Sequence, residues 1–128
     1  MRLLLDTCTF LWITEAAPAL PPRVIALYEA LENEVYLSTA SAMEIAVKYS
    51  TKRLLLSEPP AAWLPRQRAA HGVEVLPVDE ESALHVSLLP WIHRDPFDRL
   101  LVAQAIVHGM TILTSDRLIT QYPARTMW

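Results

Sequence analysis

Hydrophobic and polar positions divide the chain into short apolar runs separated by longer segments with helical spacing. Short, continuous apolar runs with polar residues on either side are typical of strands buried on both faces of a sheet. Four segments have this form, and they are residues 2–6, 34–38, 73–78 and 110–114. The sequence "ARTMW" at 124–128 predicts a further, small edge strand. The pattern therefore predicts four or five strands.

Helical spacing fills the intervals between these strands. In residues 22–33 the apolar side chains Val24, Leu27, Tyr28 and Leu31 recur on one helix face. Further helices are predicted at 8–16, at 41–52, at 59–72 with a kink or break at Pro65, at 80–89, at 95–108 and at 115–122. Strands that alternate with helices form a parallel sheet with helices on both faces. We therefore expect a single α/β domain over residues 1–128.

Three polar patterns mark where helices begin. Ser41-x-x-Glu44 has the form of a capping box, and Asp79 is placed to cap the segment "EESALHVSLL". Asp95 followed by Pro96 is typical of an N-cap carboxylate with proline at the first helical position. These patterns predict the starts of the helices over 41–52, 80–89 and 95–108.

The helix that begins at Asp95 is apolar on nearly every side, so we expect it to be heavily buried. It places Asp98 at its third position, where the helix dipole favours a negative side chain. Gly109 follows its last residue, as glycine does at many helix C-termini. Both aspartates of "HRDPFDRLL" thus have a structural explanation. The rest of the chain must show whether either one also takes part in catalysis or metal binding.

Composition limits the class of protein. Hydrophobic residues make up 52% of the 128 residues. No apolar run approaches the ~20 residues that a membrane helix needs. Asp6 interrupts the only early apolar run, so no signal peptide is expected and we predict a cytoplasmic protein. The apolar surplus, which includes Trp12, Trp63, Trp91 and Trp128, indicates either a partner interface or a dense monomeric core.

Cysteine, histidine and charge exclude several kinds of site. The single cysteine, Cys8, rules out an internal disulfide and a cysteine-based zinc site, and its simplest interpretation is a small buried residue. A histidine-based zinc site is not expected either, because the histidines share no element; they are His71, His85, His93 and His108. The net charge of −3 excludes a generally basic nucleic-acid binder, so any nucleic-acid function needs a local site.

Four acids are predicted to meet at one edge of the sheet. Asp6 closes the first strand, Glu44 lies in the helix after the second, Asp98 begins the buried helix, and Asp116 follows the fourth strand. In a parallel sheet, ligands bind beyond the carboxyl ends of the strands. Four carboxylates there would repel one another unless a cation were bound, and Mg²⁺ prefers oxygen ligands. Such a centre supports hydrolysis of a phosphate ester by a metal-activated water.

Each acid also has a structural interpretation. Asp6 and Asp116 could cap the segments that follow them, and Asp98 could serve the helix dipole. Glu44 could form an ion pair with Lys48 four residues later. Taken singly, these interpretations are the simpler ones, but their joint placement at one edge favours a site.

Four stretches resemble, in order and spacing, the motifs of PIN domains, most closely the VapC-type toxins of prokaryotic toxin–antitoxin pairs. They are "LLLDTCTFLW", "SAMEIAVK", "HRDPFDRLLVAQA" and "LTSDRLI". The resemblance covers nearly the whole chain and implies a ribonuclease dependent on Mg²⁺ or Mn²⁺. It implies that Asp6 and Asp98 are the principal metal ligands, that Asp116 completes the metal site, and that Glu44 helps to hold the metal or the attacking water. All four would then be catalytic.

The resemblance also implies partners and supporting residues. An RNA substrate, a small antitoxin that covers the crevice and a homodimer are expected. Thr7 and Ser115 match polar positions that support the acids or contact phosphate. Phosphate contacts from basic side chains are a further hypothesis, with ordinary surface charge as the alternative; these side chains are Lys48, Arg94, Arg99 and Arg117.

Two rival interpretations remain open. Another Mg²⁺-binding acidic domain, such as a phosphatase or a phospho-acceptor receiver, has the same architecture. A phosphatase of the haloacid dehalogenase type needs a second acid where this chain has Cys8, and a receiver needs paired acids there and a late lysine. The other rival is a catalytically silent binding module, against which the four acids argue.

Overall fold

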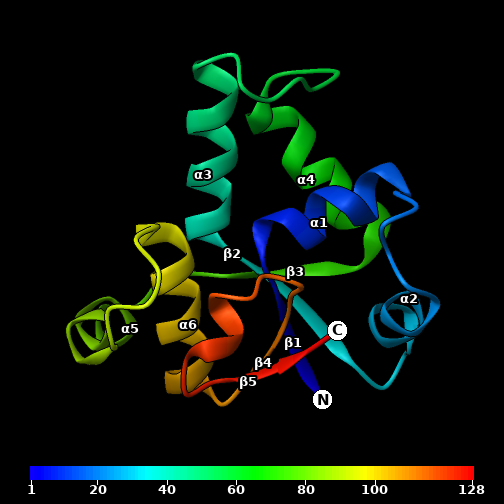
Figure 1. Cartoon of the computed structure of the whole chain (residues 1–128). Helices are drawn as coiled ribbons and strands as arrows, with labels where there is room; N and C mark the ends of the chain where they lie inside the picture. The colour runs from blue at the N-terminus through cyan, green and yellow to red at the C-terminus, as the bar shows by residue number, and fades with distance from the viewer.

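The computed structural model describes residues 1–128 and contains one five-stranded sheet in which every pair of neighbours is parallel (Figure 1). The order of the strands across the sheet is β3-β2-β1-β4-β5. Their bounds are β1 (Arg2–Leu5), β2 (Glu34–Ser38), β3 (Val73–Leu76), β4 (Thr111–Leu113) and β5 (Arg125–Met127). The predicted α/β class is confirmed, and the predicted edge strand is β5, paired with β4.

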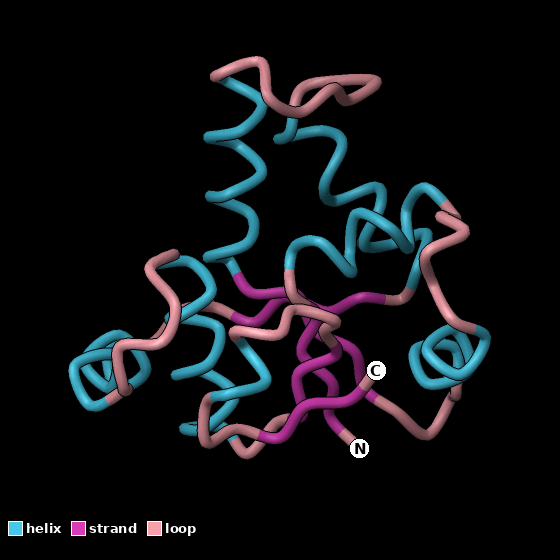
Figure 2. The backbone as a smooth tube through the Cα atoms, in the orientation of Figure 1, coloured by secondary structure: helices cyan, strands magenta, loops and turns pink.

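Helices fill the connections between the strands, as Figure 2 shows. They are α1 (Thr7–Glu15), α2 (Pro22–Glu29), α3 (Thr39–Ser50), α4 (Pro60–His71), α5 (Glu80–His85) and α6 (Pro96–His108), with short 3-10 turns η1 (Val86–Leu88) and η2 (Ile119–Gln121). Helices α1, α2 and α4 cover one face of the sheet, and α5 and α6 cover the other (Figure 1). Helix α3 rises from the carboxyl end of β2 (Figure 1).

Strand β1 divides the hydrophobic core in two. Leu3 and Leu5 pack into a cluster with residues of α1, α2 and α4, whereas Leu4 packs with residues of α6 and β4. Successive side chains of a strand point to opposite faces of the sheet. Because helices cover both faces, all three leucines are fully buried. The central strand is therefore fixed from both sides, and so is the residue that follows it.

Helix α6 begins and ends as the sequence predicts. Oδ1 of Asp95 accepts hydrogen bonds from the backbone N–H groups of Phe97 (2.8 Å) and Asp98 (3.3 Å). Gly109 ends the helix in the left-handed conformation, with φ of 63°, which costs glycine little. Five consecutive residues, 101–105, are buried in the helix, so its position relative to the sheet is well determined.

The predicted start of α3 at the capping box of Ser41 is wrong. The helix begins at Thr39, with Ser38 as N-cap accepting a hydrogen bond from the N–H of Ala40. Strand β2 ends at Ser38, so the chain enters the helix with no connecting loop. Glu44 consequently lies in the second turn, where its side chain does not cap the helix.

Several other elements are shorter than predicted. Helix α2 ends at Glu29, because the chain turns there: the backbone N–H of Asn33 bonds to the carbonyl of Ala30, and its side chain bonds to the carbonyl of Leu27. Leu31 is fully exposed and is not on the buried face. The helix predicted at 115–122 is only η2, the one predicted at 80–89 is split into α5 and η1, and strand β3 ends at Leu76.

The helix predicted at 59–72 is α4, and it continues through Pro65. No helix is long and apolar enough to cross a membrane. The tryptophans are divided between core and surface. Trp63 is buried, Trp12 and Trp128 pack against each other, and Trp91 is 84% exposed.

Candidate metal centre

The site lies where the order of the strands changes direction. From the central strand β1 the chain goes to β2 on one side of the sheet, and later returns through α6 to β4 on the other side. A crevice forms at the carboxyl ends of two such strands. Asp6 follows β1 directly and Asp116 follows β4 after two residues, so both acids lie at this crevice.

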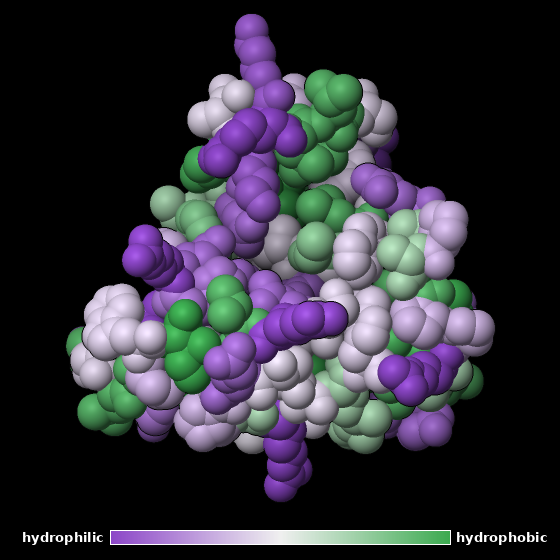
Figure 3. Space-filling view, in the orientation of Figure 1, coloured by the Kyte–Doolittle hydropathy of each residue, from purple (hydrophilic) through white to green (hydrophobic).

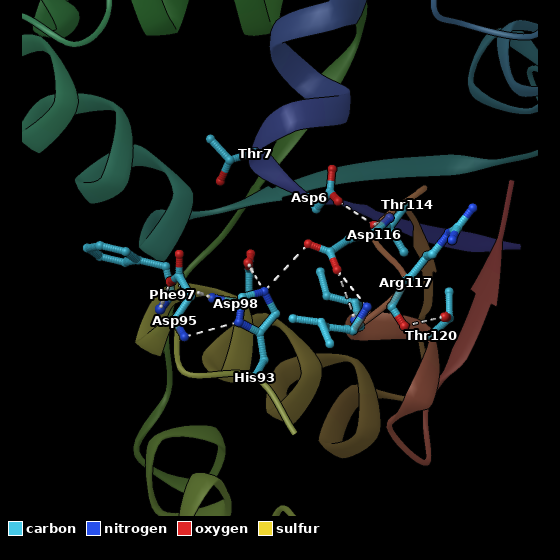
Figure 4. A network of polar contacts seen from close by, with 12 residues as sticks. Asp6, Thr7, His93, Asp95, Phe97, Asp98, Thr114, Asp116, Arg117 and Thr120 are labelled. Carbon is cyan, nitrogen blue, oxygen red and sulfur yellow. Dashed lines mark hydrogen bonds and ion pairs between the residues drawn. The ribbon is translucent and has the colours of Figure 1, made fainter. Parts of the chain in front are cut away.

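A cavity of about 390 Å³ occupies the crevice, and all four predicted acids line it. Figure 4 shows Asp6, Asp98 and Asp116 from three separate elements around it. Thr7 and Ser115, the predicted supporting residues, also line the cavity, as do Cys8, Leu11, Lys48, His93 and Asp95. The prediction that the four acids share one edge of the sheet agrees with this placement.

Asp6 is buried, and both of its carboxylate oxygens accept hydrogen bonds. Oδ1 accepts from the backbone N–H of Thr9 at 2.8 Å, so Asp6 also caps α1. Oδ2 accepts from the hydroxyl of Thr114. Burial raises the pKa of Asp6 above its usual value; the hydrogen bonds from Thr114 and Thr9 oppose that rise, and the nearby charge of Asp116 adds to it. A structural role and a chemical role are therefore compatible in this residue.

Asp116 is held by its backbone and its side chain. Its N–H donates to the hydroxyl oxygen of Thr114 at 3.0 Å. Its Oδ1 accepts from the N–H groups of Leu118 (2.8 Å) and Ile119 (3.3 Å), which is the capping role considered from the sequence. Thr7 and Ser115 are the predicted supporting residues, but the hydroxyl that contacts Asp6 and Asp116 belongs to the buried Thr114.

Glu44 is held by two polar partners. Its Oε1 accepts a hydrogen bond from the hydroxyl of Thr7 at 2.7 Å, and its Oε2 forms an ion pair with Lys48 at 2.7 Å. Thr7 Oγ1 also lies 2.9 Å from Oγ of the buried Ser41. The ion pair predicted four residues apart is confirmed, and it leaves Glu44 buried with its charge compensated.

The carboxyl group of Asp98 is strongly perturbed by its surroundings. Burial raises its pKa to about 8, and the charges of Asp95, Glu44, Asp6 and Asp116 add to that rise. Repulsion of this kind is relieved when a cation is bound among the acids. The donors of the crevice are mainly carboxylate oxygens, the ligands that a hard divalent cation prefers. The residues present therefore fit a Mg²⁺ or Mn²⁺ ion.

His93 belongs to the site, although it was not among the site residues predicted from the sequence. Its Nε2 lies 3.0 Å from Oδ2 of Asp98 and 3.5 Å from Oδ2 of Asp116 (Figure 4). The potential ligand atoms of these three residues all lie within 4.8 Å of one another. One sequence signal could have identified it: His93 comes just before the Asp95–Pro96 helix start, and so close to Asp98.

Two of the sequence-based assignments do not agree with the structure. Cys8 is exposed at the crevice and is not a buried core residue. Arg99 is buried, with hydrogen bonds from its guanidinium to the carbonyls of Pro90 (2.8 Å) and Val86 (3.1 Å), so it is not free to contact phosphate. Its guanidinium carbon also lies 4.0 Å from the centre of the Trp91 ring.

The remaining basic candidates lie at the surface. Lys48 is at the crevice, and Arg94 lines a neighbouring cavity. The side chain of Arg117 points away from the acids (Figure 4). Lys48 and Arg94 are therefore the candidates for phosphate contacts that the structure retains.

Comparison with known proteins gives the family. A family model described as PIN domain matches residues 3–124 of the chain. The chain belongs to the PIN-domain family. The resemblance noted from the motifs is thereby confirmed.

This PIN domain is similar to two VapC proteins of Mycobacterium tuberculosis. Ribonuclease VapC22 is 32% identical over 122 residues, which cover 93% of this chain and 90% of that protein. Ribonuclease VapC16 is 31% identical over 104 residues, which cover 69% of this chain and 74% of that protein. Among PIN domains, the chain is therefore of the VapC type.

The fold of this PIN domain also matches solved structures. The structure of VapBC2 from Rickettsia felis bound to a DNA fragment from its promoter contains a chain with a TM-score of 0.74 and 15% sequence identity. The match covers 99% of this chain and 98% of that chain. At this identity, the likeness shows the fold.

Proposed function

We propose that this protein is a metal-dependent endoribonuclease and the toxin of a toxin–antitoxin pair. The observation that carries the proposal is the cavity at the carboxyl ends of β1 and β4, lined by four acids whose crowding contributes to raising the pKa of Asp98 to about 8. The VapC relatives, named ribonucleases, support RNA as the substrate. The absence of a second acid at Cys8 argues against the phosphatase alternative.

Asp6, Asp98 and Asp116 would hold Mg²⁺ or Mn²⁺, with Glu44 beside them. A divalent cation at such a site lowers the pKa of a water molecule and neutralises charge that develops on phosphate oxygens. The carboxylates of the chain fix where the water and the scissile phosphate can lie. Thr7 and Lys48 hold Glu44 in one orientation, so that its carboxylate can accept a proton or orient water at a defined position.

Lys48 supplies a positive charge at the rim of the crevice. Its ammonium group is 2.7 Å from Glu44, and its side chain is 39% exposed, so a phosphate could reach it. Ser115 lines the same cavity and is exposed. We propose that Lys48 and Ser115 contact phosphate oxygens of the substrate.

A second cavity, of about 310 Å³, continues from the crevice between α3 and the start of α6. The two cavities share Glu44, Lys48 and Asp95, while the outer part of the second is lined by Val47, Arg53, Arg94, Pro96 and Phe97. Figure 4 shows the Phe97 side chain pointing away from the acids. Cationic groups beside an aromatic ring are typical of surfaces that bind single-stranded nucleic acid. We propose that the nucleotide next to the scissile phosphate lies here.

An antitoxin partner is supported by the solved neighbour and by an apolar groove. The neighbour is part of a VapBC2 complex. In this chain, a groove between α1, α4 and the segment before α4 is lined by the apolar side chains of Leu11, Leu55, Leu56 and Trp63, together with four polar residues. Hydrophobic side chains gather on this part of the surface (Figure 3). Leu55 is 92% exposed. We propose that a small antitoxin packs an apolar segment in this groove, beside the crevice, and that both proteins act in the cytoplasm.

A homodimer is the second assembly that we propose. Three large apolar side chains near α5 are exposed: Leu84 (66%), Leu88 (75%) and Trp91 (84%). Exposed apolar side chains that lie close together are common at protein–protein interfaces. Light scattering of the purified protein tests this, and a Trp91→Ser, Leu88→Ser variant should shift a dimer towards monomer.

The nuclease proposal is tested with purified protein that is free of antitoxin and stripped of metal. We expect it to cleave total RNA after addition of Mg²⁺ or Mn²⁺, and we expect Asp6→Asn and Asp98→Asn to be inactive. Asp79→Asn is the matched control, because Asp79 is an acid outside the crevice that pairs with His108. Folded wild-type protein that cleaves no RNA with either metal would contradict the proposal and favour a binding role. Equal cleavage by Asp98→Asn would show that a different set of residues is catalytic.

A further inference from the structure

The ring of His93 has a defined partner at each nitrogen. Its Nδ1 lies 3.1 Å from the backbone nitrogen of Asp95, and its Nε2 faces Oδ2 of Asp98 at 3.0 Å and Oδ2 of Asp116 at 3.5 Å. The side chain is 15% exposed. Figure 4 shows the ring between the start of α6 and the segment after β4.

The backbone partner decides which nitrogen carries the proton. A backbone N–H can only donate, so Nδ1 of His93 must accept from Asp95 with its lone pair. A neutral imidazole has one N–H, and that proton is then on Nε2. Nε2 is then the nitrogen that carries the proton within ion-pair distance of Oδ2 of Asp98 and Oδ2 of Asp116.

This arrangement is incompatible with His93 as a metal ligand. A ligating Nε2 needs its lone pair free, which would move the proton of the neutral ring to Nδ1. The Nδ1–H would then face the N–H of Asp95, placing two donors against each other at 3.1 Å. Ring rotation would break the contacts with the acids. The closeness of His93 to two acids therefore does not make it a third ligand.

We propose that His93 is a positioning residue whose Nε2–H holds the carboxylates of Asp98 and Asp116 in place for the metal. The inference rests on the metal site of the proposed function. The contact occupies Oδ2 of Asp98 and leaves Oδ1 with no hydrogen-bond partner in the protein. It also joins α6 to the segment after β4, so that acids from two elements keep one relative position.

The segment that carries His93 is itself held from the protein interior. The backbone N–H of His93 donates to the hydroxyl oxygen of Tyr122 at 2.7 Å, and Nη1 of Arg99 donates to the same oxygen at 3.1 Å. Arg99 also bonds to the carbonyls of Pro90 and Val86 in the preceding segment. This explains why a buried arginine lies next to the acids but does not enter the crevice: it fixes the backbone from which His93 reaches them.

The tautomer can be measured directly. In metal-free protein labelled with ¹⁵N-histidine, two-bond ¹H–¹⁵N correlation spectra report which ring nitrogen is protonated, and the His93→Gln variant assigns the signals. We expect His93 to be protonated at Nε2 and to remain so after saturation with Mg²⁺. A proton on Nδ1, or loss of the Nε2 proton when the metal binds, would overturn the proposal. With Mn²⁺, pulsed electron paramagnetic resonance should detect no directly bonded histidine nitrogen.

Metal affinity shows whether His93 acts as a hydrogen-bond donor or only fills space. His93→Gln keeps an amide N–H that can reach the acids, whereas His93→Leu fills similar volume without a donor. Removing a hydrogen bond that orients a metal ligand weakens metal binding about 10- to 100-fold. We therefore expect the Mn²⁺ dissociation constant to rise by about tenfold in His93→Leu and by much less in His93→Gln.

Equal loss of affinity in both variants, or no loss in either, would contradict a donor role for His93. These results do not depend on RNA cleavage. Wild-type protein that binds no divalent metal would overturn the proposed function, while the tautomer would still decide whether His93 donates to the acids. Wild-type protein that binds metal but cleaves no RNA would leave the role of His93 intact.

Discussion

The hydroxyl of Thr114 donates a hydrogen bond to Oδ2 of Asp6 and accepts one from the backbone N–H of Asp116. Two acids from neighbouring strands, 110 residues apart in sequence by their numbers 6 and 116, are thereby fixed to each other by one side chain. The relative position of the acids at the crevice is determined by the fold before any ligand is present.

Replacing Thr114 by valine should weaken both the fold and the metal site. The change keeps the shape of the side chain but leaves a buried carboxylate with one donor fewer, which costs about 1–3 kcal/mol. Urea unfolding measures the loss, and Mn²⁺ titration should show weaker binding. Thr111→Val is the matched control, since Thr111 is a buried residue of the same strand region whose hydroxyl has no hydrogen-bond partner in the protein. Equal destabilisation in both variants would contradict the role given to Thr114.

The stability of the metal-free protein should fall as the pH rises from about 4 to about 8. The pKa of Asp98 is raised to about 8 and that of Asp6 is also raised, so the folded state binds protons that the unfolded chain has released. The sign follows from linkage: protonation within this window favours the folded state. Urea unfolding in the presence of a chelator, repeated across this range, measures the slope.

The Asp98→Asn variant is the control for this pH dependence. It carries no titrating group at that position, so we expect a smaller slope and a melting temperature above that of the wild type near pH 8 without metal. Saturating Mg²⁺ should also reduce the slope, because the cation neutralises the same charges. An unchanged slope in Asp98→Asn would show that Asp98 is not the group responsible.

Asp95→Ala should lower stability by about 1 kcal/mol, the usual effect of removing a helix N-cap. The carboxylate of Asp95 caps α6, while the N–H that orients His93 belongs to the backbone and survives the substitution. We therefore expect RNA cleavage to persist below the lowered melting temperature. Loss of cleavage with unchanged stability would assign Asp95 a chemical role.

Arg53→Ala and Arg94→Ala should weaken RNA binding without affecting metal binding. Each contact with a phosphate of single-stranded nucleic acid contributes about 0.7 to the slope of log affinity against log salt concentration. Binding of a fluorescent single-stranded RNA to the inactive Asp6→Asn protein measures affinity and slope together. Arg23→Ala, on the exposed surface of α2, is the control. An unchanged slope in the double variant would exclude the second cavity as the path of the strand.

Much of this structure could be predicted from the sequence because its signals are local. The runs at β1, β2 and β4 are short and mostly apolar, and the Asp95–Pro96 step marks the start of α6 without reference to anything distant. In a parallel sheet the residues that follow the strands lie at the same edge. The placement of the four acids could therefore also be predicted.

The contacts between distant elements could not be predicted in the same way. Thr114 reaches Asp6 at the other end of the chain, and His93 reaches Asp116 across the crevice. Apart from the position of His93 just before a helix start, no local pattern points to these contacts. Arg99 looked like a surface cation because the carbonyls that bind it belong to an irregular segment. Ser41 matched a capping pattern, but Ser38 three residues earlier provides the cap.

The parallel pairing of β1 with β4 has a consequence for how the protein is made. Leu3 pairs with Thr111, so the innermost strand of the sheet stays without one of its neighbours until residues 111–113 have left the ribosome. During synthesis the first aspartate of the crevice exists without the last, and the Thr114 hydrogen bond between the two sides cannot form. A nascent chain that has not reached Thr114 therefore lacks the complete crevice, on which the proposed nuclease activity depends.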